Sequence, residues 1–330
     1  MSNAFRFVIV GSGNMADTYA KILAELSGLG LAATVSRSGR RPQSVPEHVE
    51  LVDSLANVQS DYDAVILATP NGMHAAGAIE AAALGKHVLT EKVLDVTREA
   101  MDTMIRACRD ADVKLGVAFQ RRMSPDNQAL RALLDNSVLG RVFGADLVVK
   151  FYRDQAYYDS SPYRGDRTLD GGGPFIQQAA HNVDVYVWLF GLPQTVVSAL
   201  GTFCHEIEGE DHGAALLRYD NGMVGTIIAS TSCKPGFPAR LEVHAEKGTV
   251  VLENDEITVW EVEGVTNPSS AGQTKIHSGA SSAAVSDTAG HEAIVLDFVE
   301  AVREDRDPIV AGEDARRATE LILDIYANGI

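Results

Sequence analysis

The sequence predicts an α/β protein of two domains, and three observations carry this prediction. Its 330 residues exceed the usual size of one domain. Short β-branched runs alternate with helical patterns up to about residue 122, which is typical of βαβ units that close into a parallel sheet. Beyond that point, strands follow one another between turn signals, which indicates a large, mostly antiparallel sheet with helices. We therefore expect one domain at 1–122 and a second at 123–330.

The elements of the first half follow from hydrophobic periodicity. The helix expected over 97–111 shows the pattern well, because Met101, Met104, Ile105 and Cys108 fall on one face. The expected strands are 7–10, 31–36, 64–68, 87–90 and 114–119. The other helices are expected at 15–27 and 74–84.

The second half begins with a helix expected at 125–136 and continues as strands. Asp220-Asn221-Gly222 predicts a hairpin turn, since Asn and Gly tolerate positive φ. Residues 263–290 are rich in Ser, Gly, Ala and Thr and predict a long loop, followed by helices at 292–304 and 313–327. The expected strands are 142–152, 195–204, 214–219, 223–231, 239–245, 249–252 and 257–261.

Charge and cysteine content exclude several classes of protein. The formal net charge of −17 disfavours binding to nucleic acid or to anionic membrane surfaces. No apolar stretch approaches the roughly 20 residues that span a bilayer. Cys108, Cys204 and Cys233 fit neither a disulfide framework nor a metal-ligand spacing. These features favour a cytoplasmic protein with no metal site.

A glycine motif carries the strongest chemical signal. The first strand runs into Gly11-Ser12-Gly13-Asn14-Met15-Ala16, a G-x-G-x-x-A pattern that opens a helix. Gly11 allows a tight turn, Gly13 lets backbone approach a pyrophosphate, and the helix N-terminus favours negative charge. The alternative is an ordinary glycine turn. In this strand-turn-helix context the motif predicts a Rossmann dinucleotide-binding domain.

The end of the second strand favours NADP over NAD. An NAD-binding fold usually carries Asp or Glu there to bind the ribose hydroxyls. This chain has Ser36-Arg37-Ser38-Gly39-Arg40-Arg41 instead. Hydroxyls and guanidinium groups bind a 2′-phosphate, so we expect contacts from Ser36, Arg37 and Arg41. The alternative is a solvated basic loop, with NAD as the cofactor.

Several further motifs, taken together, resemble the Gfo/Idh/MocA family of oxidoreductases. The resemblance covers nearly the whole chain and includes Glu210-Asp211 and the Asn221-Gly222 turn. Each motif alone is weak, but their order and spacing are specific. The motifs are Ala68-Thr69-Pro70-Asn71-Gly72-Met73-His74, Glu91-Lys92, Phe119-Gln120-Arg121-Arg122, Gly171-Gly172-Gly173 and His181-Asn182-Val183-Asp184.

The resemblance implies reversible hydride transfer at a carbinol carbon of a sugar, sugar derivative or polyol. Lys92 matches the lysine of the family's Glu-Lys-Pro motif and would hydrogen-bond the reacting oxygen. His181 matches the family's candidate general acid/base. The structural alternatives are a surface lysine at a strand end and a core histidine on an apolar helix. The resemblance also implies cofactor contacts from Thr69, Pro70, Asn71, His74, Glu91, Lys92, Gln120 and Arg164, and substrate contacts from Lys92, Arg122, Tyr158, Gln177 and His181.

Two residues depart from the family pattern. Val93 replaces the proline after the lysine, and because a cis bond before a non-proline residue costs about 3 kcal/mol, we expect any cis geometry to be lost. Gln177 stands where the family commonly has Asp, four residues before His181. An amide cannot exchange a proton at neutral pH, so acid/base work would fall on His181 and Lys92, with Gln177 binding a hydroxyl.

Other assignments remain open from sequence alone. A catalytically silent regulator that binds dinucleotide, or a glycosidase that oxidises and re-reduces its substrate on tightly bound NAD, would share most of these motifs. Tyr158 is expected to stack on a sugar face, and Arg164 to reach the cofactor amide or a substrate oxygen. An uncovered face of the second sheet predicts a homodimer or homotetramer.

Overall fold

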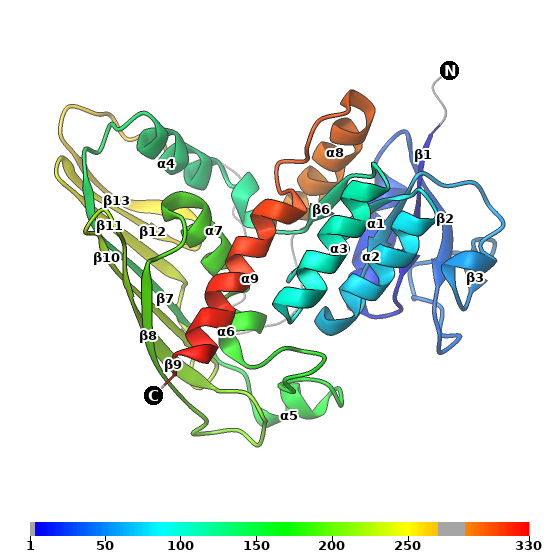
Figure 1. Ribbon diagram of the computed structural model, residues 1–330, viewed down its shortest axis with the longest axis horizontal. Helices are drawn as coiled ribbons and strands as arrows, with labels where there is room; N and C mark the ends of the chain where they lie inside the picture. The colour runs from blue at the N-terminus through cyan, green and yellow to red at the C-terminus, as the bar shows by residue number, and fades with distance from the viewer. Residues whose placement is uncertain (1–3, 270–287, 330) are drawn as a thin grey trace. The chain divides into compact units, whose positions relative to one another are not determined.

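The computed structural model describes residues 4–269 and 288–329, and Figure 1 shows their secondary structure. The chain divides into two compact units. The first comprises residues up to 119 together with 291–316, and the second comprises 120–290 together with 317–330. The segment 291–316 therefore belongs to the first unit, whereas the sequence suggested a single boundary at residue 122.

Pairing at the last strand of the first unit explains this difference. The amide of Val117 donates to the carbonyl of Val310 at 3.0 Å, and Gly116 forms a β-bridge with Ala311. Phe298, from the helix α8 (Ala289–Glu304), packs its ring 6.4 Å from that of Phe7. These contacts join segments about 190 to 290 residues apart, which local periodicity does not reveal.

The first unit contains a six-stranded sheet in the order β3-β2-β1-β4-β5-β6, and every pairing in it is parallel. The strand order reverses between β1 and β4, so the loops that leave these two strands flank a switch point, where α/β sheets bind ligands. The strands are β1 (Phe5–Val10), β2 (Leu29–Val35), β3 (Glu50–Val52), β4 (Ala64–Leu67), β5 (His87–Thr90) and β6 (Leu115–Val117).

Helices connect these strands as the sequence predicts. The face of α3 (Arg98–Asp110) that carries Met101 and Cys108 is buried, as expected from the periodicity. The edge strand β3 was not predicted, since three half-buried residues show no alternation. The remaining helical segments are α1 (Asn14–Glu25), α2 (His74–Ala83), η1 (Leu55–Asn57) and η2 (Asn71–Met73).

The second unit contains a seven-stranded sheet in the order β13-β12-β11-β7-β10-β9-β8. All its pairings are antiparallel except that of β7 with β10, which confirms the mostly antiparallel sheet. Gly222, at φ +85°, turns the chain between β9 and β10, as expected. The strands are β7 (Val142–Lys150), β8 (Thr195–Gly201), β9 (His212–Arg218), β10 (Val224–Ser230), β11 (Arg240–Ala245), β12 (Gly248–Glu253) and β13 (Glu256–Val262).

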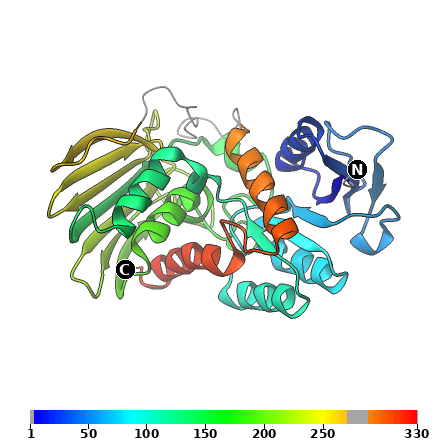
Figure 2. The same ribbon diagram turned by 90° about the horizontal axis from the view of Figure 1, so that it is seen from above.

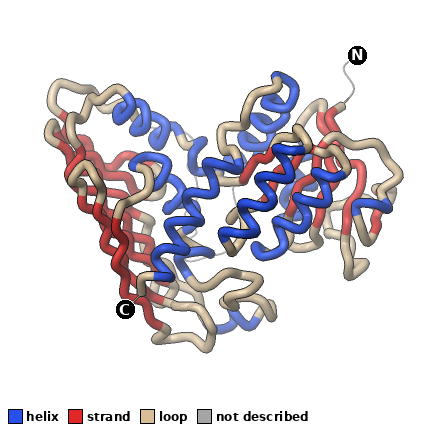
Figure 3. The backbone as a smooth tube through the Cα atoms, viewed as in Figure 1, coloured by secondary structure: helices blue, strands red, loops and turns tan. Residues whose placement is uncertain are grey.

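Helices cover one face of this sheet (Figures 2 and 3). Alternation along the strands buries residues such as Leu147 and Leu217 beneath them. The short helices α5 and α6 were not predicted, and residues 270–287 of the expected loop lie outside the described part of the chain. The helical segments are η3 (Gln120–Met123), α4 (Pro125–Asp135), α5 (Gln155–Asp159), α6 (Pro174–Gln177), α7 (Ala180–Phe190) and α9 (Gly312–Ala327), of which α9 begins in the first unit.

Two further features of residues 4–269 and 288–329 bear on function. No helix in these ranges is long and apolar enough to cross a membrane. No group of three His, Cys, Asp or Glu side chains in the same ranges is placed to hold a metal ion.

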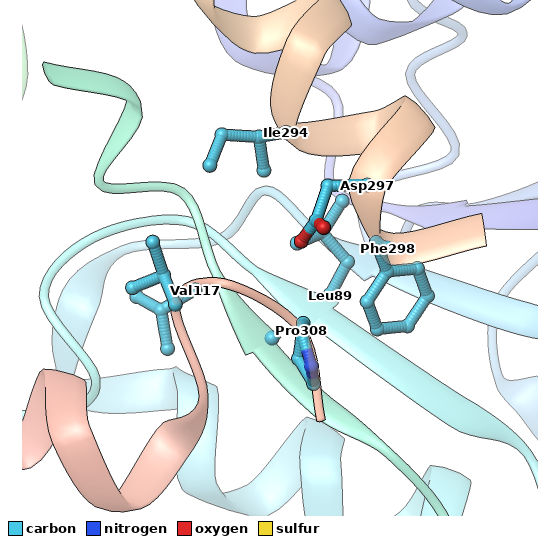
Figure 4. Close-up of a pocket in the computed structure, with 8 residues that line it drawn as sticks. Leu89, Val117, Ile294, Asp297, Phe298 and Pro308 are labelled. Carbon is cyan, nitrogen blue, oxygen red and sulfur yellow. The ribbon is translucent and has the colours of Figure 1, made fainter. Parts of the chain in front are cut away.

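A small pocket lies beside α8 in the first unit, and its lining is mainly apolar (Figure 4). Leu89, Phe298 and Pro308 contribute to its wall. Asp297 adds a carboxylate, but that group accepts a 2.7 Å hydrogen bond from the amide of Ile309 and pairs with Arg306. We assign no ligand to this pocket.

Candidate active site

The turn between β1 and α1 requires glycine at its first position. Gly11 has φ +132°, and a Cβ atom there would lie 2.3 Å from the carbonyl oxygen of Ala68. Its amide donates to the carbonyl of Val35 at 3.0 Å. A side chain at residue 11 would therefore collide with backbone, and the turn brings the first, second and fourth strands together at their carboxyl ends.

Gly13 serves a different purpose, because a Cβ atom there would meet nothing within 4 Å. Gly13 is the N-cap of α1, and no described side chain caps that helix. Asn14 is exposed and Met15 half-buried in the first helical turn. An exposed, uncapped helix N-terminus beside a residue without a side chain fits a pyrophosphate, which would accept hydrogen bonds from the free amides.

In the loop after β2, the basic residues Arg37 and Arg41 have different surroundings. Ser36 is buried, and its hydroxyl lies 3.2 Å from that of Ser38, in a tight turn closed by Gly39. Arg37 is exposed in this turn. Arg41 instead donates from Nη1 to the carbonyls of Pro46 and Val49, at 3.0 and 2.7 Å. Arg41 therefore shapes the loop, which corrects its expected role in binding nucleotide.

The loop after β4 holds an unsatisfied polar atom. The hydroxyl oxygen of Thr69 is buried and has no hydrogen-bond partner among the described residues. Pro70 and the buried Asn71 follow it and begin η2. A buried hydroxyl without a partner costs free energy, so this atom suits a ligand that completes its hydrogen bonding.

His74 has a structural role instead of the expected cofactor contact. Its Nδ1 lies 2.7 Å from the carbonyl oxygen of Val93, and its Nε2 lies 3.0 Å from that of Thr69. The ring is fully buried, and burial lowers the pKa of His74. With both nitrogens occupied by backbone, His74 ties the loop after β4 to the loop after β5.

The loop after β5 carries Glu91 and Lys92. Glu91 is buried and accepts a 2.7 Å hydrogen bond from the hydroxyl of Tyr19, whose pKa is raised by burial. His291 contributes an Nε2 atom 3.9 Å from the same carboxylate. The side chain of Glu91 is thus held by α1 and α8, and it fixes the backbone from which Lys92 projects.

The peptide bond between Lys92 and Val93 is cis, so the expectation that this geometry would be lost was wrong. The tertiary contacts of Val93 were not visible in sequence. Its side chain is fully buried, and its carbonyl is bound by His74. Lys92 itself is half-buried and follows β5 at the carboxyl end of the parallel sheet.

In the second unit, Gln177 ends α6 and His181 lies in the first turn of α7. Both side chains are half-buried. The glycine run before them packs against protein: a Cβ atom on Gly173 would lie 1.7 Å from the carbonyl oxygen of Glu210. The carboxylate of Glu210 accepts the amides of Gly173 and Phe175, each at 3.1 Å. Glu210 therefore orders the start of α6, and the glycine at residue 173 is needed for this close approach of backbone.

Asp170 is a site residue that sequence reasoning missed. Its Oδ1 accepts a hydrogen bond from the side-chain amide of Gln177 at 2.5 Å, and its Oδ2 accepts the amide of Gly165 at 2.9 Å. Asp170 is buried. A carboxylate is therefore present beside the position where the family usually has Asp, but it comes seven residues earlier in the chain and orients the amide.

Arg122, expected at the substrate, directs its guanidinium to a carboxylate within the second unit. Nε and Nη2 bind the two carboxylate oxygens of Asp184 at 2.7 and 2.6 Å. Both side chains are buried. The neighbouring Gln120 leaves its buried Oε1 without a hydrogen-bond partner among the described residues, which is compatible with a ligand-binding role.

The surroundings of Tyr158 also differ from the expectation that its ring stacks on a sugar face. Its hydroxyl lies 2.7 Å from that of Thr231, its ring packs against His205, and burial raises its pKa. A buried ring with an occupied hydroxyl cannot stack on a sugar. The adjacent Tyr157 instead lies beneath the guanidinium of Arg164, whose carbon is 4.0 Å from the ring centroid.

The chain has a parallel sheet with an uncapped glycine turn and a separate sheet domain, which is the architecture of a dinucleotide-binding oxidoreductase. Comparison with known proteins identifies its family. Residues 5–119 match the oxidoreductase family with an NAD-binding Rossmann fold, and residues 127–251 match the GFO/IDH/MocA C-terminal domain. The chain belongs to the GFO/IDH/MocA family of oxidoreductases.

Curated relatives include enzymes that use either nicotinamide cofactor. Inositol 2-dehydrogenase of Rhizobium meliloti is 26% identical over 275 residues, covering 80% of this chain and 81% of that protein. The scyllo-inositol 2-dehydrogenase (NADP(+)) IolU of Bacillus subtilis is also 26% identical, covering 75% and 76%. The scyllo-inositol 2-dehydrogenase (NAD(+)) of the same organism is 27% identical, covering 77% and 71%.

Among solved structures, the WlbA dehydrogenase of Bordetella pertussis in complex with NADH and UDP-GlcNAcA superposes with a TM-score of 0.85. It is 28% identical, with 98% of this chain and 96% of that chain covered.

Proposed function

We propose that this protein is an NADP-preferring dehydrogenase that transfers a hydride between the nicotinamide and a carbinol carbon of a sugar, sugar derivative or polyol. The observation that best supports this proposal is the glycine turn, where Gly13 and the uncapped N-terminus of α1 leave room for a pyrophosphate. The relatives named as inositol dehydrogenases support the reaction class.

The preference for NADP rests on the loop after β2. Residues 36–41 contain no carboxylate that would repel a 2′-phosphate. Arg37 is exposed beside the buried Ser36, and no described residue forms an ion pair with its guanidinium. A free guanidinium and a hydroxyl are suitable partners for a phosphate dianion. Arg41 takes no part in this proposal.

Lys92, His181 and Gln177 are the proposed catalytic residues. The nicotinamide, when bound, accepts or supplies the hydride. In the oxidative direction His181 would take the hydroxyl proton as the carbinol carbon loses its hydride, and Lys92 would stabilise negative charge on that oxygen. Gln177 would hydrogen-bond a substrate hydroxyl, with its amide oriented by Asp170. Thr69, Asn71 and Gln120 would contribute polar contacts to the cofactor.

The outer face of the second sheet supports a homo-oligomeric assembly. Val197, Leu216 and Val224 are 47%, 53% and 49% exposed on β8, β9 and β10. Leu216 and Val197 are paired across neighbouring strands, so their side chains form continuous apolar surface. Size-exclusion chromatography with light scattering would measure the predicted dimer or tetramer. A free state for Cys108, Cys204 and Cys233 also suits a reducing compartment such as the cytoplasm.

A fluorescence titration of nucleotide-free protein with NADPH and, separately, with NADH tests the cofactor proposal. We expect NADPH to bind at least tenfold more tightly, a difference of about 1.4 kcal/mol. Equal or reversed preference would contradict the assignment of Ser36 and Arg37. A turnover screen with inositols and sugars then tests the reaction. Nucleotide binding without turnover of any polyol would favour a silent regulator, and copurified nucleotide with no net redox change would favour a glycosidase.

A further inference from the structure

Two guanidinium groups meet at one aromatic ring in the second unit. The guanidinium carbon of Arg164 lies 4.0 Å from the centroid of the Tyr157 ring, and that of Arg153 lies 5.5 Å from it. Arg153 is only 7% exposed, and its burial, together with the nearby charge of Arg164, lowers its pKa. Two like charges this close repel each other, so the arrangement favours the approach of a negatively charged group.

The carboxylates on neighbouring segments are already engaged. Asp211 accepts the backbone amides of Phe203 and Cys204 and lies 3.0 Å from Nδ1 of His205. Asp170 binds Gly165 and Gln177. Across residues 4–269 and 288–329, Arg164 forms no ion pair, and its buried Nε has no hydrogen-bond partner. Arg164 therefore retains a donor that the protein does not satisfy.

The hydroxyl of Tyr157 accepts a hydrogen bond from the segment that carries the proposed catalytic residues Gln177 and His181. The side-chain amide of Gln178 donates to the hydroxyl of Tyr157 at 3.2 Å, and Gln178 lies between α6 and α7, next to Gln177 and three residues before His181. Its Oε1 is buried and has no hydrogen-bond partner within the described residues. The cluster thus offers an unsatisfied donor and an unsatisfied acceptor beside the junction of α6 and α7.

Asp170 also connects the segment that carries Arg164 to the junction of α6 and α7. One of its carboxylate oxygens binds the amide of Gly165, the residue after Arg164, and the other binds the side chain of Gln177. Gly165 has φ +76°, and a Cβ atom there would lie 2.9 Å from the side chain of Ile207. The backbone that presents Arg164 is consequently fixed relative to Gln177.

We propose that Arg164, supported by Tyr157 and Arg153, binds an oxyanion carried by the sugar substrate, a carboxylate or a phosphate, and that Gln178 accepts a hydrogen bond from one of its hydroxyls. This inference rests on the proposed function and specifies its substrate class. The second half of the chain, residues 123–330, has 15 Lys and Arg against 31 Asp and Glu. Its general field therefore repels anions, and a local pair of guanidiniums would be needed to admit one.

Isothermal titration with three sugars of matched ring structure tests this site. The protein, without nucleotide and again with saturating NADPH, is titrated with glucuronate, glucose 6-phosphate and glucose. We expect at least one of the charged sugars to bind tenfold or more tightly than glucose, with an affinity that falls as salt increases. A preference for glucuronate assigns the oxyanion as a carboxylate, and a preference for glucose 6-phosphate assigns it as a phosphate.

The variant R164Q should abolish the preference for the charged sugar. R167Q is the matched control, because it removes the same charge from an exposed residue of the same loop. Thermal melting of each variant establishes that it is folded. If glucose binds as tightly as both charged sugars, or if R164Q keeps the preference, the inference is wrong. Failure of the proposed function would appear separately, as loss of NADPH binding or of polyol turnover in the wild-type protein.

Discussion

Arg122 and Asp184 form a bidentate ion pair in which both side chains are almost fully buried, at 1% and 0% exposure. The pair joins η3, where the chain enters the second unit, to the middle of α7. The guanidinium carbon also lies 5.7 Å from the centroid of the Trp188 ring. The aspartate in His181-Asn182-Val183-Asp184 therefore anchors the helix that presents His181.

Replacing either member of this pair should strongly destabilise the second unit. Removing one partner leaves the other charge buried without compensation, so we expect D184N to lower the free energy of unfolding by about 3–5 kcal/mol. Urea denaturation measures the change. D135N, which breaks the exposed pair between Arg131 and Asp135, is the matched control and should change it by less than about 0.5 kcal/mol. Equal effects of the two substitutions would contradict the role assigned to the buried pair.

The two glycines of the nucleotide turn should respond differently to substitution. G11A places a methyl group against the carbonyl of Ala68 and should lower the melting temperature. G13D leaves the fold intact, because its side chain meets open space, but brings a carboxylate to the pyrophosphate position. We expect at least a hundredfold loss of NADPH affinity with an unchanged melting temperature. Normal nucleotide binding by G13D would show that the pyrophosphate binds elsewhere.

Arg37 is predicted to decide the cofactor preference. R37Q should weaken NADPH binding at least tenfold and change NADH binding by less than twofold, since only NADPH carries the 2′-phosphate. Fluorescence titration of both nucleotides gives the two constants. R41Q is the informative comparison, because Arg41 is engaged with backbone carbonyls and its loss should reduce stability without selecting between nucleotides. The same fractional loss for both nucleotides in R37Q would refute the prediction.

Gln177 should not tolerate a carboxylate, despite the family's usual Asp. Q177E would bring a second carboxyl group into the 2.5 Å contact with Asp170, and two close carboxylates do not readily ionise together. We expect Q177E to lose stability progressively as the pH rises from about 4 to 7, when measured by urea denaturation. The double variant D170N/Q177E removes the like charge and should recover most of the loss. No recovery would contradict coupling between the two residues.

Asp211 should contribute stability at neutral pH that disappears in acid. Burial alone would raise its pKa, but hydrogen bonds from Cys204, Phe203 and His205 outweigh it and hold the pKa below the usual 3.8. For a carboxyl group with a lowered folded-state pKa, stability is present above the unfolded value and lost as the pH falls through the folded one. The stability difference between the wild type and D211N should therefore be full above pH 4 and shrink below it. A constant difference across the acid range would contradict this assignment.

The sequence predicted well those features that local pattern determines. The glycine turn, the buried face of α3 and the Asn221-Gly222 hairpin were all expected from spacing and residue type. The order of family motifs identified the chain's family before any fold was known. Each of these signals lies within a few residues, so backbone geometry or one amphipathic face is enough to produce it.

The roles that were missed depend on partners far away in the chain. Arg122 was expected at the substrate because nothing near it in sequence shows that Asp184, 62 residues later, neutralises it. His74 and Tyr158 were assigned to ligands for the same reason. Asp170 was overlooked because its importance comes only from the orientation of Gln177. Sequence pattern reveals which residues are polar or special, whereas three-dimensional contacts decide which of them remain available.

Because α8 belongs to the first unit, that unit cannot complete its folding early in synthesis. Strand β6 ends at Val117, but its edge is completed by Val310 and Ala311, and Phe7 contacts Phe298. During synthesis, the nucleotide-binding unit is therefore unfinished until more than nine-tenths of the protein has left the ribosome. The second unit is translated in the meantime, so folding of the first does not simply precede it, and a release of the chain after residue 122 yields a nucleotide domain that lacks its last packing partner.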